Sequence, residues 1–233
     1  MSKVIMAIGA HIGDMELTVG GVLATEALKG AKIVTVALTA GERGNPKGVS
    51  QEDYRKQKVA EAKAFVDTLG PNNEAIVFEY RDGELPNNEE VRIQVAELIR
   101  KYKPSVIYTH WKSTMHKDHN NTHLIVPEAQ FFAGIDVGEK VKGERHYAPV
   151  YFAENWEDAD DYVPYIYTEV SIEGYQLWCE AIRKHWFIMN SSSFKYYDYY
   201  THLARVRGCL ANVMYAQTFA VYDRQKRIIQ KQS

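Results

Sequence analysis

The sequence predicts a single-domain α/β protein, residues 1–233, with a doubly wound and mostly parallel β-sheet. Short apolar runs typical of buried strands alternate along the chain with longer amphipathic segments typical of helices. This alternation indicates a parallel sheet that helices cover on both faces. The length suits one large domain of this kind, and neither a linker nor an internal repeat divides the chain.

The elements are clearest in the first half of the chain, where glycine, proline and asparagine mark the breaks between them. In order, we predict strand 4–8, helix 15–28, strand 33–38, loop 41–48, helix 52–69, strand 75–78, helix 89–102 and strand 106–108. Beyond Gly134 the pattern loosens through an acidic stretch at residues 154–161, and further helices are predicted at residues 173–184 and 197–213. The order is typical of a Rossmann-like fold, in which ligands bind beyond the carboxyl ends of the strands.

Composition narrows the class of partner. The formal net charge is -2, so no strong field favours nucleic acid or an anionic membrane, and a small-molecule ligand fits better. The two cysteines have no CxxC spacing, which argues against a disulfide framework or a cysteine-rich metal site. The N-terminus does not resemble a signal peptide, and no apolar stretch approaches the length of a membrane helix. We therefore expect a cytoplasmic protein.

Histidine and aspartate gather at two strand ends. His11 and Asp14 follow the first predicted strand, and the segment 110–119 after the fourth strand contains three histidines and an aspartate. A doubly wound sheet can bring these two loops together. Imidazole nitrogen and carboxylate oxygen suit zinc, and three protein ligands leave a position open for water, as hydrolysis requires.

Each of these residues also has a plain structural interpretation. A single histidine near a strand end is usually a satisfied core or loop residue, and Asp14 suits the start of a helix. The pairing of two clusters favours a shared metal site over these separate explanations. His110 and His123 are expected to have structural or supporting roles.

The two clusters resemble the paired motifs of the LmbE-like, or PIG-L, family of zinc-dependent N-deacetylases, which act on N-acetylglucosaminyl compounds. The family's Ala-His-Pro-Asp-Asp and His-x-Asp-His motifs match residues 10–14 and 116–119. Its Thr-x-Gly-Glu, Asp-Gly-x-Leu and Tyr-Ala-Glu-x-Phe motifs resemble residues 39–42, 82–85 and 215–219. The resemblance spans most of the chain and implies an LmbE-like fold.

The resemblance also implies roles for individual residues. By position, His11, Asp14 and His119 would be the metal ligands, with zinc favoured and iron, cobalt or nickel acceptable. His116 would donate to the oxyanion that develops when water attacks the acetamide carbonyl, and Asp118 would orient and charge His116. Family members often form trimers or hexamers, so a homo-oligomer is expected.

One position departs from the family pattern. The first aspartate of the family's motif is its general base, and Gly13 stands there in this chain. General base catalysis typically contributes about 10²–10⁴-fold, so another group would have to replace it. Glu42 and Asp118 are the predicted substitutes, and Glu16 is a third candidate that is expected to point away from the metal. The glycine is equally compatible with a tight turn.

Three basic residues are candidates for substrate binding. The family often has an arginine early in the helix after the second strand, and Lys58 aligns with it, one helical turn after Arg55. Arg43 follows Glu42 in the preceding loop and completes the predicted set. A solvated helix face is the alternative for the helical pair. The aromatic stretch at residues 186–200 suits core packing, a subunit interface or stacking on a sugar ring.

The leading hypothesis is a zinc-dependent N-deacetylase that hydrolyses a linear amide C–N bond of an N-acetylated amino sugar or glycoside. The rival is a non-catalytic member that keeps the metal and binds a sugar, and Gly13 is the feature that favours it. A nucleotide-binding domain is a third class, but Gly9 and Gly13 lack the G-x-G-x-x-G spacing.

Overall fold

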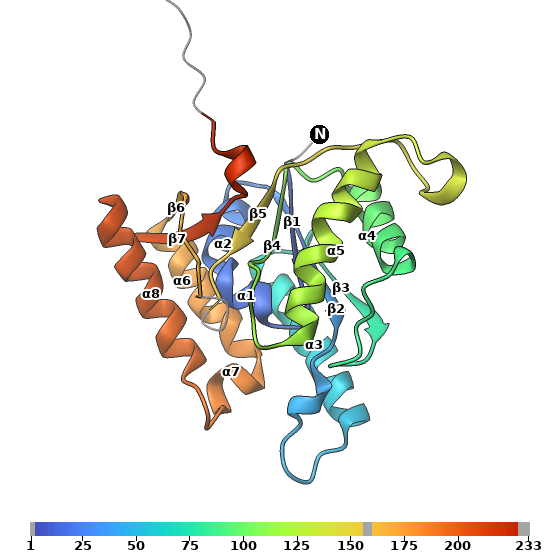
Figure 1. The fold of residues 1–233 in the computed structure, drawn as a ribbon. Helices are drawn as coiled ribbons and strands as arrows, with labels where there is room; N and C mark the ends of the chain where they lie inside the picture. Colours follow the sequence, from blue (N-terminus) through green and yellow to red (C-terminus); the bar gives the residue numbers. More distant parts are fainter. Residues whose placement is uncertain (1–2, 156–159, 228–233) are drawn as a thin grey trace, which may run out of the picture.

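A computed structural model describes residues 3–155 and 160–227, so residues 156–159 of the predicted acidic stretch lie outside the described residues. The described residues form one seven-stranded sheet in the order β3-β2-β1-β4-β5-β7-β6 (Figure 1). Its strands are β1 (Val4–Gly9), β2 (Lys32–Thr39), β3 (Glu74–Tyr80), β4 (Val106–His110), β5 (Val150–Ala153), β6 (Ile166–Val170) and β7 (Tyr215–Ala220). The predicted α/β class with a mostly parallel sheet is confirmed.

The eight α-helices of the described residues are α1 (Asp14–Thr18), α2 (Gly20–Leu28), α3 (Gln51–Leu69), α4 (Glu89–Tyr102), α5 (Lys117–Gly134), α6 (Ile172–Ala181), α7 (Trp186–Asn190) and α8 (Tyr196–Ala211). The described residues also form the short 3-10 helices η1 (Glu42–Gly44), η2 (Gly138–Lys140), η4 (Ile182–Lys184) and η5 (Asp223–Gln225). Helices α3 and α4 begin at capping side chains, because Ser50 and Asn88 accept backbone N–H groups of their first turns.

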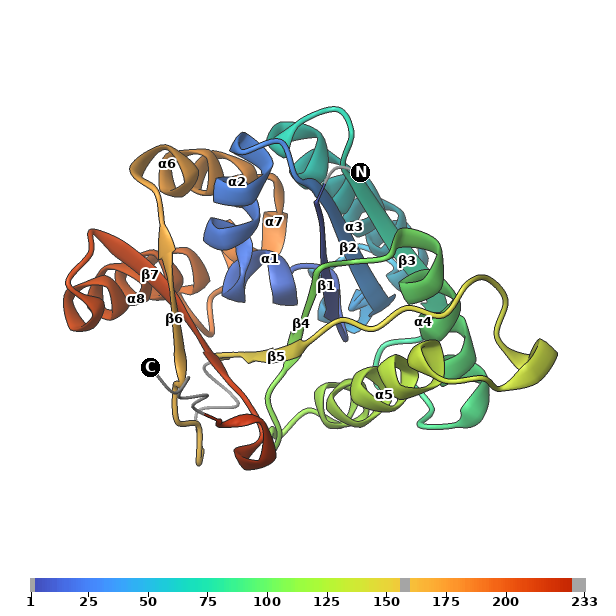
Figure 2. The same cartoon turned by 90° about the horizontal axis from the view of Figure 1, so that it is seen from above.

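Helices cover both faces of the sheet because neighbouring residues of β1 point in opposite directions. Ile5 and Ala7 pack in a core with α2, α3, α6, α7 and α8, whereas Met6 and Ile8 pack with α4 and α5. Figure 2 shows the two groups of helices on opposite sides of the strands. The central strands are therefore mostly apolar, which explains their clear pattern in the sequence.

Strand order reverses beside β1. The chain passes from β1 to β2 and β3 on one side, then returns through α4 to β4, which pairs with β1 in parallel on the other side. In a doubly wound sheet this reversal opens a crevice beyond the carboxyl ends of the two neighbouring strands. The loops after β1 and β4 meet there.

The predicted helix at residues 15–28 is wrong in one respect, because it is divided at Val19 into α1 and α2. The Trp178 indole N–H donates to the Glu16 carbonyl at 2.8 Å, and that carbonyl would otherwise serve the helix. A Cβ at Gly20 would lie 2.2 Å from the Trp178 indole nitrogen, so only glycine permits this approach. The division therefore depends on a contact with a residue distant in the sequence.

The last three strands escaped prediction. β5 continues the parallel sheet, but β7 pairs with β5 and β6 in the antiparallel direction. β6 is an edge strand whose residues alternate between half-buried and exposed, and it includes the polar pair Thr168 and Glu169. Short edge strands carry a weaker apolar signal than central ones, which is why the pattern loosens after Gly134.

Candidate metal centre and its cavity

The loop after β1 is folded back on itself by Asp14, the first residue of α1. The backbone N–H of His11 donates to Asp14 Oδ2 at 2.7 Å, and the N–H of Asp14 donates to the His11 carbonyl at 3.3 Å. Glu16 Oε2 accepts the N–H of Gly13 at 3.0 Å in the same turn. These local bonds hold His11 and Asp14 side by side at the carboxyl end of β1.

The three predicted metal ligands meet as a triangle of donor atoms. His11 Nδ1 lies 3.2 Å from Asp14 Oδ2 and 3.1 Å from His119 Nε2, and the third edge, from Asp14 Oδ2 to His119 Nε2, is 3.3 Å. Ligand atoms bonded at about 2.0–2.1 Å to a tetrahedral zinc ion lie about 3.3 Å apart, so the triangle fits such an ion. His119 comes from α5 rather than from the loop after β4.

The far nitrogen of His11 faces two further carboxylates. His11 Nε2 lies 3.3 Å from Asp82 Oδ1 and 3.6 Å from Asp118 Oδ2. A proton on Nε2 would be held by these carboxylates, which leaves the Nδ1 lone pair directed at the triangle. The arrangement of carboxylate, histidine and metal site is a common way to fix a metal-binding imidazole.

The electrostatic field favours a cation at the triangle of His11, Asp14 and His119. Burial alone would lower the pKa of His11, but the Asp14 carboxylate, with Asp118 and Asp82, raises it well above its ordinary value. Burial lowers the pKa of His119 to about 4, with a contribution from His110, so its imidazole is a neutral donor. Burial would raise the pKa of Asp14, but His119 and His11 lower it well below its ordinary value. The field that attracts positive charge to His11 also suits a divalent metal.

His116, the last residue before α5, is half-buried beside the triangle. Its Nδ1 accepts the backbone N–H of Asp118 at 3.2 Å, so in the neutral ring the proton is on Nε2. Burial and the nearby His11 lower the pKa of His116. The role predicted for the Asp118 carboxylate stays a prediction: it accepts the Gly83 N–H at 2.6 Å and raises the pKa of His116 through space, while Asp82 Oδ1 lies 3.7 Å from His116 Nε2.

Two other histidines support this corner. His110 Nε2 accepts the Ala10 N–H at 3.1 Å and lies 3.1 Å from Asp14 Oδ2. The ring N–H of His123 donates to the His110 carbonyl at 3.0 Å, while its other nitrogen lies 3.1 Å from the Tyr222 hydroxyl. The His110 ring thus contacts the loop after β1, and the His123 ring contacts the end of β4, which is compatible with the supporting roles predicted for both.

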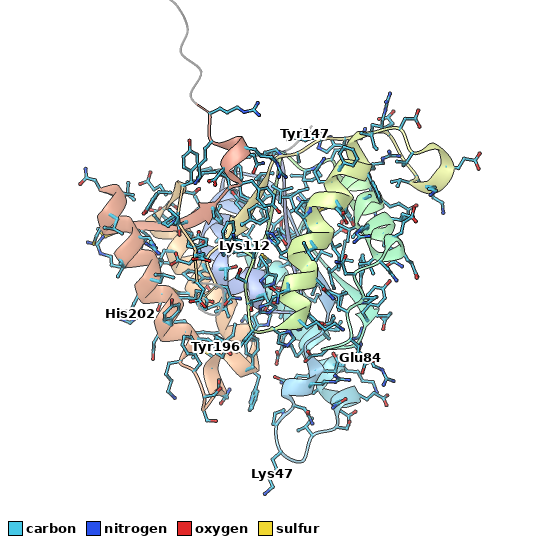
Figure 3. All side chains as sticks on the ribbon, viewed as in Figure 1. Lys47, Glu84, Lys112, Tyr147, Tyr196 and His202 are labelled. Atoms are coloured by element: carbon cyan, nitrogen blue, oxygen red, sulfur yellow. The ribbon has the colours of Figure 1, made fainter. Side chains whose placement is uncertain are left out.

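A cavity of about 770 Å³ lies beside the triangle, and Tyr196, labelled in Figure 3, is one of its lining residues. This volume is in the range of small-molecule sites. Its polar and metal-facing lining includes His11, Asp14, Arg43, Lys58, Asp82, His116, His119 and Asn155. Its aromatic lining includes Tyr54, Trp186, Phe187, Tyr196 and Tyr200, so part of the predicted aromatic stretch forms a wall of the cavity.

Phe187 occupies the space beside Gly13. A Cβ at residue 13 would lie 2.6 Å from two ring carbons of Phe187, and Gly13 has a φ of 104°, which disfavours any other residue. The glycine therefore does not leave an open space for a ligand, as a glycine beside a metal site could. The Phe187 ring, which belongs to α7, fills the position toward which a side chain at residue 13 would point.

The remaining predicted residues divide into two groups. Glu42 Oε1 accepts the Asp82 N–H at 3.0 Å, and Arg55 donates to the Phe78 carbonyl and Glu79, so both residues brace β3 and neither lines the cavity. Arg43 lines the cavity rim and forms an ion pair with Glu84. Asp118 is fully buried behind the cavity, and Glu16 is buried as well.

Lys58 enters the cavity from α3 and is only 4% exposed. Its ammonium lies 4.5 Å from the centre of the Phe187 ring and 5.8 Å from that of Tyr54. A cation–π contact contributes about 0.5–2 kcal/mol, whereas burial of an ammonium costs several kcal/mol. Burial accordingly lowers the pKa of Lys58, although Asp14 and Asp82 oppose the shift.

Two residues of the site were missed in the sequence. Asp82 is part of the motif at residues 82–85, which was noted without a role, and its position after β3 was the available signal. Burial would raise its pKa, but the contact with His11 lowers the pKa to about 2, so it is ionised. No local signal could have placed Phe187 beside Gly13, because the contact joins α7 to the loop after β1.

Fold and site together define an α/β protein with a buried histidine and aspartate group that fits one divalent metal. The profile of the PIG-L family, described as GlcNAc-PI de-N-acetylase, matches residues 6–130, more than half of the chain. The chain belongs to this family. The resemblance inferred from the motifs is thereby confirmed.

Known proteins give further likenesses. The diacetylchitobiose deacetylase of Thermococcus kodakarensis is 28% identical over 137 residues, which are 57% of this chain and 51% of that protein. This chain thus spans about half the length of that relative. The 4-carboxy-2-hydroxymuconate hydratase of Pseudomonas putida has the same fold, with a TM-score of 0.85, 22% identity and coverage of 99% of this chain and 100% of that one.

The N,N'-diacetylchitobiose deacetylase of Pyrococcus horikoshii also shares the fold. Its TM-score is 0.79 at 19% identity, and the alignment covers 94% of this chain and 83% of that one. Within the described part of the chain, no helix combines the length and apolar character needed to cross a bilayer.

Proposed function

We propose that this chain is a metal-dependent N-deacetylase that hydrolyses the acetamide of an N-acetylated amino sugar or glycoside. The observation that carries the proposal is the triangle of His11 Nδ1, Asp14 Oδ2 and His119 Nε2 at the floor of the cavity. Zinc is the proposed metal, because two imidazoles and a carboxylate suit it, and iron, cobalt or nickel would also be accepted. The named activities of the two chitobiose deacetylases support the substrate class.

A metal at this position would supply Lewis acidity toward water and toward the acetamide carbonyl. His116 would stabilise the oxyanion that develops on the carbonyl oxygen, because its Nε2 proton is available beside the triangle. A single donor of this kind typically contributes about 10²–10³-fold to kcat. Asp82 would keep His11 in its tautomer from behind, and at 3.7 Å from His116 Nε2 it leaves the proton of that nitrogen available.

A proton must also leave the attacking water, and the predicted acceptors for it are Glu42, Asp118 and Glu16. Of the predicted substitutes, Glu42 and Asp118 do not line the cavity, and we propose that they hold Asp82 and the Gly83 loop in position. Asp82 does line the cavity, but with a pKa of about 2 it is a weak base. We therefore expect slow deacetylation relative to family members with an aspartate at position 13.

A second candidate is metal-assisted addition of water to an unsaturated carboxylic acid, in which H and OH add across a C=C bond. Gly13, packed against Phe187, offers no acid for a leaving amine, and hydration expels no amine, although the water must still lose a proton and the neighbouring carbon must gain one. The named activity of the Pseudomonas hydratase, whose fold matches over nearly the whole chain, gives the same support.

Acetate release from N-acetylglucosamine and diacetylchitobiose by the zinc-loaded protein tests the first candidate. We expect turnover in the natural protein and a loss of about 10²–10³-fold in kcat for His116→Ala. His202→Ala is the matched control, since His202 is exposed on α8 away from the cavity (Figure 3). Turnover that His116→Ala leaves unchanged would refute the proposed role, and hydration of a muconate-type acid without acetate release would favour the second candidate.

A non-catalytic, metal-bearing sugar binder is the remaining alternative, and the packing of Phe187 decides how to test it. Gly13→Asp by itself would collide with Phe187, so the informative variant is Gly13→Asp/Phe187→Ala, compared with Phe187→Ala. If only the double variant releases acetate, the natural protein is a non-catalytic binder. Release by the natural protein supports the enzyme.

The proposal extends to the setting of the enzyme. We propose a cytoplasmic homo-oligomer, a trimer or hexamer, in which residues 1–233 form a single domain and Lys58 and Arg43 contact the substrate. Light scattering after size exclusion measures the oligomeric state. A monomer at micromolar concentration would contradict that part of the proposal.

A further inference from the structure

Lys58 is a charged residue of the cavity whose ammonium has no counter-ion at contact distance among the described residues. Its side chain is nine-tenths buried and lines the cavity, and its ammonium makes no hydrogen bond or ion pair with any residue in 3–155 or 160–227. A buried cation normally has a carboxylate or several acceptors beside it. Cation–π contacts with Phe187 and Tyr54 are too weak to replace those partners.

The neighbours of Lys58 offer no anion at hydrogen-bond distance. His185 is fully buried with neither ring nitrogen bonded, and the Tyr54 hydroxyl likewise has no partner within the described ranges. Asp14, Asp82, Glu61 and Glu16 act on Lys58 only through space. The histidines engage Asp14 and Asp82, Gln57 donates to Glu61, and the Gly13 N–H donates to Glu16. The field of these carboxylates keeps positive charge at Lys58 without neutralising it.

Lys58 also lies close to the metal triangle. A Cβ at Gly41 would be 2.9 Å from the Lys58 ammonium and 3.0 Å from His11 Cβ, so the two side chains meet above Gly41. One small molecule can therefore reach the metal corner and the ammonium together. A single ammonium within aromatic walls matches one carboxylate, whereas a phosphate dianion needs more donors, and the other cavity cation, Arg43, is paired with Glu84.

We propose that the substrate carries a carboxylate and that Lys58 binds it, which makes the substrate an acidic N-acetylated amino sugar. The assignment of substrate class rests on the proposed deacetylase function, but the carboxylate site at Lys58 does not. In this arrangement the substrate's carboxylate completes a buried ion pair whose protein half is already in place. Neutral sugars leave the ammonium without that partner and bind more weakly.

Binding of a matched pair of ligands tests the proposal. N-acetylmuramic acid differs from N-acetylglucosamine by a lactyl group that carries the carboxylate. Calorimetry in the presence of a chelator prevents the carboxylate from binding a metal and prevents turnover. We expect the acid to bind at least about 10-fold more tightly than the neutral sugar, because a hydrogen bond to a charged group has that strength.

Variants of Lys58 test whether this residue causes the preference for the acidic sugar. Lys58→Met keeps the length of the side chain and should abolish the preference, whereas Lys58→Arg should retain it. Lys56→Met is the control, since Lys56 lies on the same helix but is exposed and paired with Glu52. Equal binding of the two sugars, a preference that survives Lys58→Met, or tighter binding of inorganic phosphate than of propionate would each overturn the proposal.

The two proposals can fail separately. If the zinc-loaded protein releases no acetate from either sugar but the chelated protein shows the Lys58-dependent preference, the deacetylase function fails and the carboxylate site stands. If acetate is released equally well from the acidic and the neutral sugar, the deacetylase stands and the carboxylate site is overturned. If kcat/KM is higher for the acidic sugar than for the neutral one, and Lys58→Met removes this difference, both proposals are supported.

Discussion

The buried polar side chains on the two sides of the cavity differ in whether other polar side chains lie next to them. On the side of β1 and β4, the buried histidines and carboxylates lie next to one another, as the triangle and the contact of His11 with Asp82 show, although His11 Nε2 and Asp118 Oδ1 make no hydrogen bond within the described residues. On the side of α3 and α7, Lys58, Tyr54 and His185 are buried among aromatic rings, and the described residues provide no hydrogen-bond partner for their side chains.

The difference separates two tasks. A metal site requires donors fixed before the metal arrives, so its histidines and carboxylates hold one another in place. A ligand site can leave polar groups without partners when the ligand supplies them. The family profile, residues 6–130, covers the metal side and also Lys58 and Tyr54 of α3, whereas α7 and the rest of the aromatic lining lie beyond it. We therefore expect the chemistry to reside in the first region and the specificity in the second.

The largest effect expected on the metal side is the loss of zinc from His119→Ala. Zinc sites with four ligands bind with about 10–16 kcal/mol, so one ligand contributes about 3 kcal/mol, on the order of 100-fold in affinity. Zinc content after dialysis against a graded chelator measures this. Full occupancy in His119→Ala would break the comparison, since the metal would then lie elsewhere, and His202→Ala serves as the unaffected control.

On the other side, His185 should make stability depend on pH. Burial, with the charge of Lys58, lowers its pKa to about 3, while the unfolded chain has a histidine pKa of about 6.5. The unfolded state therefore binds a proton first as the pH falls, and stability is lost below about pH 6.5. Between pH 7 and pH 5 the free energy of unfolding should fall by about 2 kcal/mol more in the natural protein than in His185→Leu.

Urea unfolding of both proteins at the two pH values gives this difference, because the carboxylates common to both cancel. His146→Leu is a control, since His146 is half-buried and its ring nitrogen lies 2.7 Å from the Pro104 carbonyl. The same pH dependence in the natural protein and in His185→Leu would mean that His185 has a proton partner after all. The contrast between the two sides of the cavity would then fail.

A smaller effect distinguishes the two carboxylates behind His11. Asp82→Asn should lower zinc affinity about 10-fold, the lower end for a residue that supports a ligand. Asp118→Asn should have a smaller effect, because its carboxylate lies farther from His11 Nε2 and already accepts the Gly83 N–H. Competition with a chromogenic chelator measures both, with Glu84→Gln as the rim control, and the reverse order would assign the orienting role to Asp118.

The sequence by itself determined the sheet class, the central strands and the three candidate ligands. Strands β1, β2 and β4 are buried on both faces, so their apolar runs are continuous and legible. His11, Asp14 and His119 follow such strands, and the carboxyl ends of neighbouring parallel strands converge. The resemblance to the family's two motifs then selected these three residues as ligands, a prediction that the triangle of their donor atoms supports.

Only the tertiary structure decided the groups that surround those ligands. Asp82 lies near His116, Trp178 divides the first helix, and Phe187 fills the space beside Gly13. Each of these contacts joins segments far apart in the chain, and side-chain packing at that distance leaves no periodic signal in the sequence. For the same reason the isolation of Lys58 could not be predicted, since a missing partner is a property of every element around it.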